Sequence, residues 1–125
     1  MQQQSIAIVG LGRVGSVFLH KLLKQAKKGI AIVAVAEQGE TAGAALAKLN
    51  NIENFSIDQI VAKGESIDIL FDLTGLSAVR KELREKYMAS ENRHTVIATE
   101  TIASFIWALI TEGESLPDVH AKMGY

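Results

Sequence analysis

The stretch Ser5-Ile6-Ala7-Ile8-Val9-Gly10-Leu11-Gly12-Arg13-Val14-Gly15 decides the fold of this chain. An apolar, β-branched run passes directly into Gly-x-Gly-x-x-Gly, and a helical pattern follows at once. In such a strand–turn–helix unit, Gly10 permits the tight turn, Gly12 lets a pyrophosphate approach the backbone, and Gly15 lets the helix pack closely on the strand. The phosphates would lie at the positive, N-terminal end of the helix.

The stretch therefore predicts a phosphate site built on a glycine loop. The residues predicted to form it are Gly10, Leu11, Gly12, Arg13, Val14 and Gly15. The alternative interpretation is a glycine-rich turn with only a structural role, because glycines also gather in ordinary turns.

A second apolar run, residues 30–36, completes a β-α-β unit with the first strand. Apolar residues recur at helical spacing between the two runs, and Gly29 is predicted to stop that helix. Both runs are apolar on both faces, which is typical of strands buried inside a parallel sheet. A right-handed crossover makes the two strands parallel neighbours.

Glu37 closes the second strand, 22 positions (37 − 15) beyond Gly15. An acidic residue at a spacing of roughly 20 bonds the adenosine ribose hydroxyls in dinucleotide-binding units. A carboxylate repels the 2′-phosphate of NADP, and the following Gln38-Gly39 supplies no arginine to receive one. The position favours NAD over NADP; the alternative is a solvated glutamate at the end of a strand.

The remainder of the chain predicts three further strands, at residues 52–55, 67–75 and 95–99. Thr41 is expected to cap a helix over residues 41–50, and Ser56 or Asp58 to cap a short helix that ends at Gly64. The inner face of the first of these helices is predicted to be Ala42, Ala45, Leu46 and Leu49. The predicted fold is α/β: a doubly wound, Rossmann-type parallel sheet of about five strands in the order 3-2-1-4-5, with helices on both faces.

The loop after the fourth strand is predicted to border the nicotinamide half of a dinucleotide. Ligands of doubly wound sheets bind outside the carboxyl ends of the strands, at the point where the strand order reverses. Thr74, Gly75 and Ser77 lie at that position, whereas Asp72 is interpreted as a structural carboxylate that bonds nearby backbone.

Two helical patterns complete the chain. Residues 76–87 carry an inner stripe of Leu76, Val79, Leu83 and Tyr87 beside a charged, solvated face in which Glu82 and Lys86 form an i,i+4 pair. Residues 102–110 are apolar nearly all round, so one face is expected to cover the sheet. The other face, including Trp107, is expected to need the C-terminal tail, a second subunit or a further domain.

Composition excludes several classes of function. The 125 residues suit one domain, predicted to span 1–125 with a tail from about residue 114. Lys plus Arg number 13 against 14 Asp plus Glu, so no basic stripe suggests nucleic acid or an anionic membrane. There is no cysteine for a disulfide or thiolate metal site. The N-terminus lacks the pattern of a signal peptide, and no apolar run approaches the roughly 20 residues of a membrane span, so the cytoplasm is expected.

No other catalytic constellation emerges from the sequence. His20, His94 and His120 have none of the zinc-ligand spacings, and no Gly-x-Ser-x-Gly elbow or P-loop lysine occurs. Glu100 follows the fifth strand on the expected ligand side, where a helix-start carboxylate needs no catalytic role. No metal site is predicted, and no catalytic residue is assigned.

Over residues 5 to about 110 the chain resembles the N-terminal NAD(P)-binding domain of homoserine dehydrogenases and of glucose-fructose and inositol dehydrogenase-like oxidoreductases. The segments that carry this resemblance are residues 8–15, 35–37 and 68–75. The inositol type has Glu-Lys-Pro after the fifth strand, where this chain has Glu100-Thr101-Ile102 and so lacks the lysine. Both families add a second domain that holds the substrate and most catalytic groups, and this chain is expected to end before it.

The resemblance implies an NAD(H)-binding domain of an oxidoreductase, similar to homoserine dehydrogenase, without its substrate domain. The chain also resembles nucleotide-binding domains at the front of some bacterial sensor kinases and regulators, which implies an alternative: a regulatory domain that senses the dinucleotide without turning it over. In either case a homodimer or a partner domain would dock on the apolar helix around residues 105–110.

Overall fold

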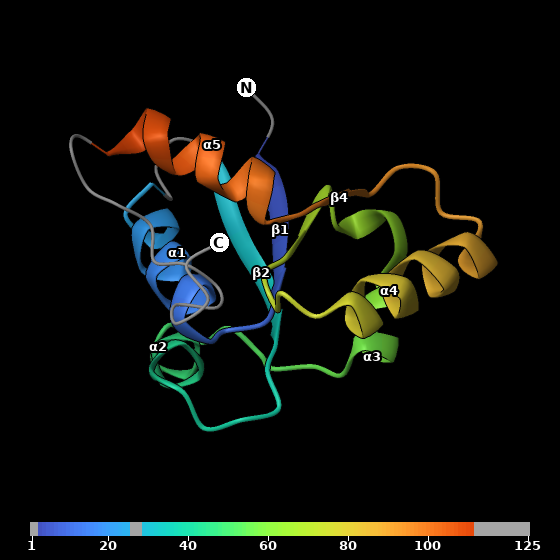
Figure 1. Cartoon of the computed structure of the whole chain (residues 1–125), viewed down its shortest axis with the longest axis horizontal. Coiled ribbons are helices and arrows are strands. Elements are labelled where there is room, and N and C mark those ends of the chain that lie inside the picture. The colour runs from blue at the N-terminus through green and yellow to red at the C-terminus, as the bar shows by residue number, and fades with distance from the viewer. Residues whose placement is uncertain (1–2, 26–28, 112–125) are drawn as a thin grey trace.

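The computed structural model describes residues 3–25 and 29–111, and it is an α/β chain with one parallel sheet (Figure 1). The elements follow in the order β1 (Gln4–Val9), α1 (Arg13–Leu23), β2 (Ile30–Ala36), α2 (Ala42–Leu49), α3 (Ile57–Ala62), the 3₁₀ helix η2 (Gly64–Ser66), β3 (Ile69–Asp72), α4 (Ser77–Ser90), β4 (Val96–Ala98) and α5 (Glu100–Ile110). Because strands alternate with helices along the chain, every strand pairing in the sheet is parallel.

The sheet has four strands in the order β2-β1-β3-β4, and β1 lies between the two halves of the chain. The chain crosses from β1 to β2 on one side and reaches β3 on the other, so the topological switch point lies between β1 and β3. The predicted doubly wound fold and the relative order of its strands are confirmed.

The strand predicted at residues 52–55 is wrong as a strand. Only a single parallel bridge joins Asn54 to Val35 at the outer edge of β2. The segment is short because Ile52 N–H still donates to the carbonyl of Ala47 at the end of α2, at 2.9 Å. Ser56 then begins α3 with a capping box that it shares with Gln59. Two backbone hydrogen bonds to Val35 are all that fit between these helices.

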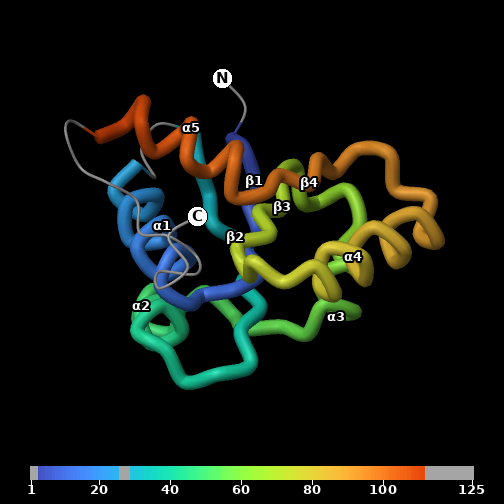
Figure 2. The backbone as a smooth tube through the Cα atoms, viewed as in Figure 1, coloured from blue at the N-terminus to red at the C-terminus, as the bar shows by residue number. Residues whose placement is uncertain are grey.

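Two apolar clusters cover the two faces of the sheet. Side chains of β1, β2 and β3 that face α1, α2 and α5 include Ile6, Ile8, Val35 and Phe71. The opposite face packs against α3 and α4, and its largest buried side chains are Ile60, Ile67, Leu70 and Leu83. Figures 1 and 2 show α1 and α2 on one side of the strands and α3 and α4 on the other. The sheet is therefore the middle of three layers.

The helix α2 packs differently from its predicted stripe. Thr41 caps it as expected, accepting from Ala44 N–H at 3.0 Å. Of the predicted inner face, however, Ala42 and Ala45 are exposed and Leu49 is 81% exposed. Leu46 packs against the core as predicted, and the fully buried residues of the helix are Gly43 and Ala47. A Cβ at Gly43 would overlap Ser16 Oγ of α1, so the helices meet through close backbone approach, which favours small residues over leucine.

The prediction for the last helix is wrong in one residue. Trp107 is only 5% exposed and packs with Ala103 in the cluster that includes α1. The large apolar side chains of α5 that remain exposed are Ile102, Phe105 and Leu109. None of the helices within residues 3–25 and 29–111 has the length and hydropathy that a membrane span requires. The predicted tail from about residue 114 and His120 lie outside the described residues.

Candidate functional site

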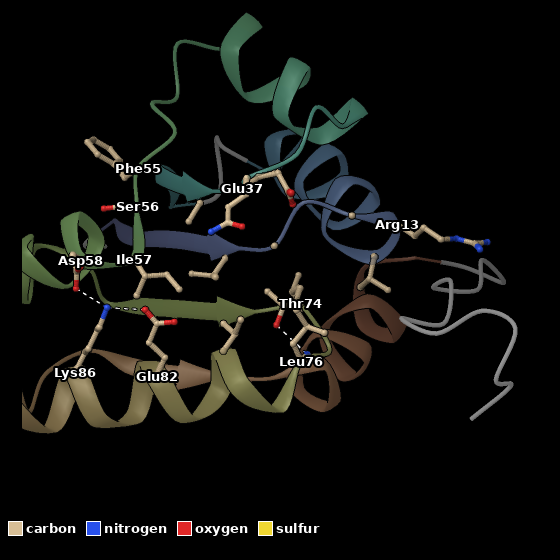
Figure 3. A pocket seen from close by; sticks show the side chains of 18 residues that line it. Arg13, Glu37, Phe55, Ser56, Ile57, Asp58, Thr74, Leu76, Glu82 and Lys86 are labelled. Carbon is tan, nitrogen blue, oxygen red and sulfur yellow. Dashed lines mark hydrogen bonds and ion pairs between the residues drawn. The ribbon is translucent and has the colours of Figure 1, made fainter.

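A cavity of about 500 Å³ opens at the carboxyl ends of β1, β2 and β3 (Figure 3). It is the place where doubly wound sheets bind ligands, beside the switch point between β1 and β3. Of the predicted site residues, six line it: Gly10, Gly12, Arg13, Val14, Glu37 and Thr74. Three loops that are far apart in the sequence thus meet at one cavity.

Four predicted residues lie outside the cavity wall. Leu11 is fully buried in the apolar core, and Gly15 is buried behind the loop. Gly75 adopts a positive φ of 70° in the loop before α4, and Ser77 is exposed as the first residue of that helix. Leu11 and Gly15 shape the loop from behind, whereas Gly75 and Ser77 do not reach the cavity in this structure.

The glycine loop has the conformation that its three glycines predict. Gly10 has a φ of 95°, and a Cβ there would come within 2.8 Å of Thr74 Cγ2. A Cβ at Gly15 would overlap the carbonyl oxygen of Gly10. At Gly12, by contrast, a Cβ would meet nothing within 4 Å. Two glycines are needed for packing inside the protein, and the third leaves open space on the cavity side.

The N-terminus of α1 faces this open space without a capping side chain. Gly12 is its N-cap residue, and the first turn contains no acidic residue. The first N–H groups of a helix lack intrahelical acceptors and carry the positive end of its dipole. This uncapped helix N-terminus fits a diphosphate, which would supply both the negative charge and the acceptor oxygens.

Glu37 joins the loop after β2 to the glycine loop. Its Oε1 accepts from Leu11 N–H at 2.6 Å, and its Oε2 accepts from Gly39 N–H at 2.8 Å. A carboxylate has about four acceptor positions, so both oxygens can still accept from the hydroxyls of a ligand. The carboxylate is thus held in place with acceptor capacity to spare at the rim of the cavity.

Asn54 and Ser16 support this arrangement, and sequence reasoning missed both. Asn54 accepts from Glu37 N–H and donates to the Glu37 carbonyl, each at 2.9 Å. Ser16 Oγ donates to the Leu11 carbonyl at 2.7 Å and accepts from Gly43 N–H at 2.9 Å. No spacing rule points to Asn54, because the contact arises only when the segment after α2 returns to the edge of β2.

Asp72 has the structural role that was predicted. It is 1% exposed, and its Oδ1 accepts from Thr74 Oγ1 at 2.8 Å and from Thr74 N–H at 3.2 Å. Thr74 Oγ1 in turn accepts from Leu76 N–H at 3.1 Å. These bonds hold Thr74 against Gly10 and define the turn between β3 and α4.

The helices α3 and α4 supply a second wall that the sequence did not assign to the site. Phe55 precedes α3, and Ile57 and Asp58 lie in its first turn. On the other helix, Val79, Glu82 and Lys86 form one stripe of α4, which Leu76 at its N-cap continues. Leu76 is 52% exposed, so it lines the cavity instead of the core where it was predicted. The recurrence of Leu76, Val79, Glu82 and Lys86 on one side of α4 is the signal that could have indicated this wall.

The remaining candidates do not line the cavity. Glu100 accepts from Arg80 at 3.0 Å, which ties the start of α5 to α4. His94 lies at the opposite end of the sheet and bonds Asp68, and His20 is exposed on α1. Within the described residues, no three His, Asp or Glu side chains are grouped closely enough to hold a metal ion.

Solved structures share this fold. A homoserine dehydrogenase from Thiobacillus denitrificans is similar over 88% of this chain and 27% of its own, with 25% identity and a TM-score of 0.56. A scyllo-inositol dehydrogenase from Lactobacillus casei is similar over 78% of this chain and 29% of its own, with 22% identity and a TM-score of 0.56. GenD2 from gentamicin A biosynthesis, solved in complex with NAD, is similar over 79% of this chain and 34% of its own, with 16% identity and a TM-score of 0.55.

The chain therefore spans about a third of the length of the solved structures that it matches. No protein-family model and no curated protein matches it by sequence. The resemblance to homoserine and inositol dehydrogenases is confirmed at the level of the fold: the chain has the Rossmann-type domain of these oxidoreductases.

Proposed function

We propose that this chain is an NAD(H)-binding domain of an oxidoreductase. The observation that carries the proposal is the shared cavity of the uncapped α1 N-terminus and Glu37. The N-terminus of α1 suits a diphosphate and Glu37 suits ribose hydroxyls, and both groups occur in the adenosine half of a dinucleotide. The fold shared with GenD2, which was solved with NAD, adds support.

NAD is the preferred cofactor in this proposal. Glu37 is positioned at the rim by two N–H donors, so its charge lies where a 2′-phosphate would approach. Its neighbour on the cavity wall is Gln38, which is uncharged, and the side chain of Arg13 extends away from Glu37 in Figure 3. A phosphate beside Glu37 would meet repulsion without an adjacent cation to offset it.

The work of the reaction would be divided between this chain and groups outside it. When bound, the nicotinamide ring supplies hydride transfer. The glycine loop would hold the diphosphate, Glu37 the ribose, and Thr74 with its neighbours Gly75 and Ser77 would border the nicotinamide half. Substrate and catalytic groups would come from a further domain, because the matched oxidoreductases are about three times as long.

Calorimetric titration of the purified chain with NAD⁺, NADH, NADP⁺ and NADPH tests this function. We expect NAD(H) to bind and NADP(H) to bind at least about tenfold more weakly, which corresponds to roughly 1.4 kcal/mol. If a folded chain binds none of the four, the glycine loop has only a structural role and the proposal is wrong.

Glu37→Gln tests the role of the carboxylate. The variant removes the charge and keeps one acceptor for a loop N–H, so NAD⁺ should bind about tenfold more weakly while NADP⁺ binds as well as before or better. Calorimetry measures both affinities. The matched control is Glu40→Gln, which changes an exposed carboxylate of the same loop outside the cavity wall. An unchanged preference in Glu37→Gln would remove Glu37 from the site.

The exposed side of α5 favours a second candidate, a regulatory domain that senses the redox state of the dinucleotide. Ile102, Phe105 and Leu109 offer an apolar surface on which a partner or second copy could dock. A sensor must associate differently with NAD⁺ and with NADH bound, because a ligand shifts only those states that it binds differently. Sedimentation with each form decides this, and identical association rejects the candidate.

A further inference from the structure

The side chain of Asn54 takes the place of a strand at the outer edge of β2. The segment before α3 forms two backbone hydrogen bonds with Val35: Val35 N–H donates to the Glu53 carbonyl at 3.2 Å, and Phe55 N–H donates to the Val35 carbonyl at 2.8 Å. Because alternate residues of a strand bond to the same neighbour, the next residue of this chain to bond on that edge is Glu37. At Glu37 the partner is a side chain, that of Asn54.

The amide of Asn54 bonds both backbone groups of Glu37. Its Oδ1 accepts from Glu37 N–H at 2.9 Å, and its Nδ2 donates to the Glu37 carbonyl at 2.9 Å. A primary amide offers the same donor and acceptor as a peptide group, so one asparagine can replace a residue of a neighbouring strand. The hydrogen-bond ladder of β2 is thereby extended by one step, to Glu37.

This bond pair acts where the sheet itself no longer holds the chain. The ladder between β1 and β2 ends at Ala36, one residue before Glu37. The Glu37 carboxylate accepts from the N–H groups of Leu11 and Gly39, and both of these residues lie in loops. Asn54 therefore fixes the backbone from which the carboxylate extends.

We infer that Asn54 is a positioning residue, which holds Glu37 so that its carboxylate faces the ribose hydroxyls and thereby sets the preference for NAD over NADP. Asn54 is exposed and does not belong to the cavity wall. Its effect on a ligand therefore passes through Glu37. This inference rests on the function proposed above.

Asn54→Ala tests the inference, because it removes both hydrogen bonds. NAD⁺ should bind about threefold more weakly while NADP⁺ binds as well as before, so the preference should fall from about tenfold to about threefold. Calorimetry gives both affinities, and their ratio within one variant is insensitive to a change in folded fraction. The matched control is Asn50→Ala, whose exposed amide donates to the Leu46 carbonyl at 2.9 Å, and it should keep the tenfold preference.

The same substitution in a Glu37→Ala chain separates positioning from a merely structural role. With no carboxylate left to orient, Asn54→Ala should change NAD⁺ affinity by less than about 1.5-fold. An equal loss in both backgrounds would overturn the inference, since Asn54 would then act by another route. A tenfold preference retained in Asn54→Ala would overturn it as well and leave the proposed function intact. A folded parent chain that binds neither dinucleotide would overturn the proposed function, and this inference with it.

Discussion

At the residue scale, the glycines of the loop differ in whether the structure has room for one more carbon atom. Gly15 has no room for a methyl group, because the carbonyl oxygen of Gly10 occupies that position. A methyl group at Gly12 would meet no other atom, and the position of Gly12 on the cavity wall makes that space available to a ligand. The same residue type thus serves packing at one position and access at another.

Alanine at these two positions should have opposite effects. Gly15→Ala should lower the free energy of unfolding by about 3 kcal/mol, because backbone must move to relieve the overlap. Gly12→Ala should change it by less than about 1 kcal/mol, yet weaken NAD⁺ binding about tenfold or more, since its Cβ enters the space a pyrophosphate needs. Urea denaturation and calorimetry measure the two quantities. If Gly12→Ala binds NAD⁺ like the parent chain, the diphosphate does not lie on this loop.

At the scale of elements, the sheet is held together at both of its ends. The carboxyl ends of the strands meet at the cavity. At the amino ends, Asp68 Oδ2, just before β3, accepts a hydrogen bond from Ser5 N–H of β1 at 2.7 Å. Its Oδ1 lies 2.6 Å from Nε2 of His94, which comes just before β4. One carboxylate therefore links β1, β3 and β4 far from the candidate site.

This carboxylate should make stability depend on pH. The Ser5 N–H and then His94 lower the pKa of Asp68 below its ordinary value. Its contribution is therefore complete above the unfolded-state pKa of about 3.9 and is lost as pH falls through the lower folded-state pKa. Asp68→Asn should weaken the fall in melting temperature between pH 5 and pH 2. Glu65→Gln, an exposed control, should not. Parallel pH profiles for Asp68→Asn and the parent chain would contradict this assignment.

At the scale of the whole molecule, the described residues leave the apolar outer side of α5 uncovered. On α5, Trp107 and Ala103 face the core, whereas Phe105 is 63% exposed and Leu109 69% exposed. The buried side of α5 contributes to the stability of the core and the exposed side does not, although both sides are apolar in the sequence. We propose this exposed side as the surface on which a further domain or a second copy docks.

Substitutions on the two sides of α5 should separate these roles. Phe105→Gln with Leu109→Gln should change the free energy of unfolding by less than about 0.5 kcal/mol, because both side chains already contact solvent. Trp107→Ala should cost about 3–5 kcal/mol through the cavity that it leaves. Urea denaturation of the isolated chain measures both. A loss above about 2 kcal/mol in the double variant would mean that this surface is covered in solution.

Local pattern in the sequence was enough to determine the architecture. The unbroken apolar runs of β1 and β2, the glycines between β1 and α1, and the caps Thr41 and Ser56 act through neighbours within a few residues. The strand order followed because right-handed crossovers leave few topologies open. The cofactor-binding roles of Gly10, Glu37 and Thr74 stay predictions, although the structure brings the three to one cavity.

Only the tertiary structure decided which residues meet across the molecule. Asn54 reaches Glu37, Gly43 contacts Ser16, and Asp58 joins Lys86 through packing between elements that no spacing in the sequence records. The same packing buries Trp107 and exposes Leu49 and Phe105, since an apolar residue shows by its type that it prefers burial but not which neighbour will cover it. Periodicity specifies the face of a helix within one element, and contact between elements depends on how those faces fit in three dimensions.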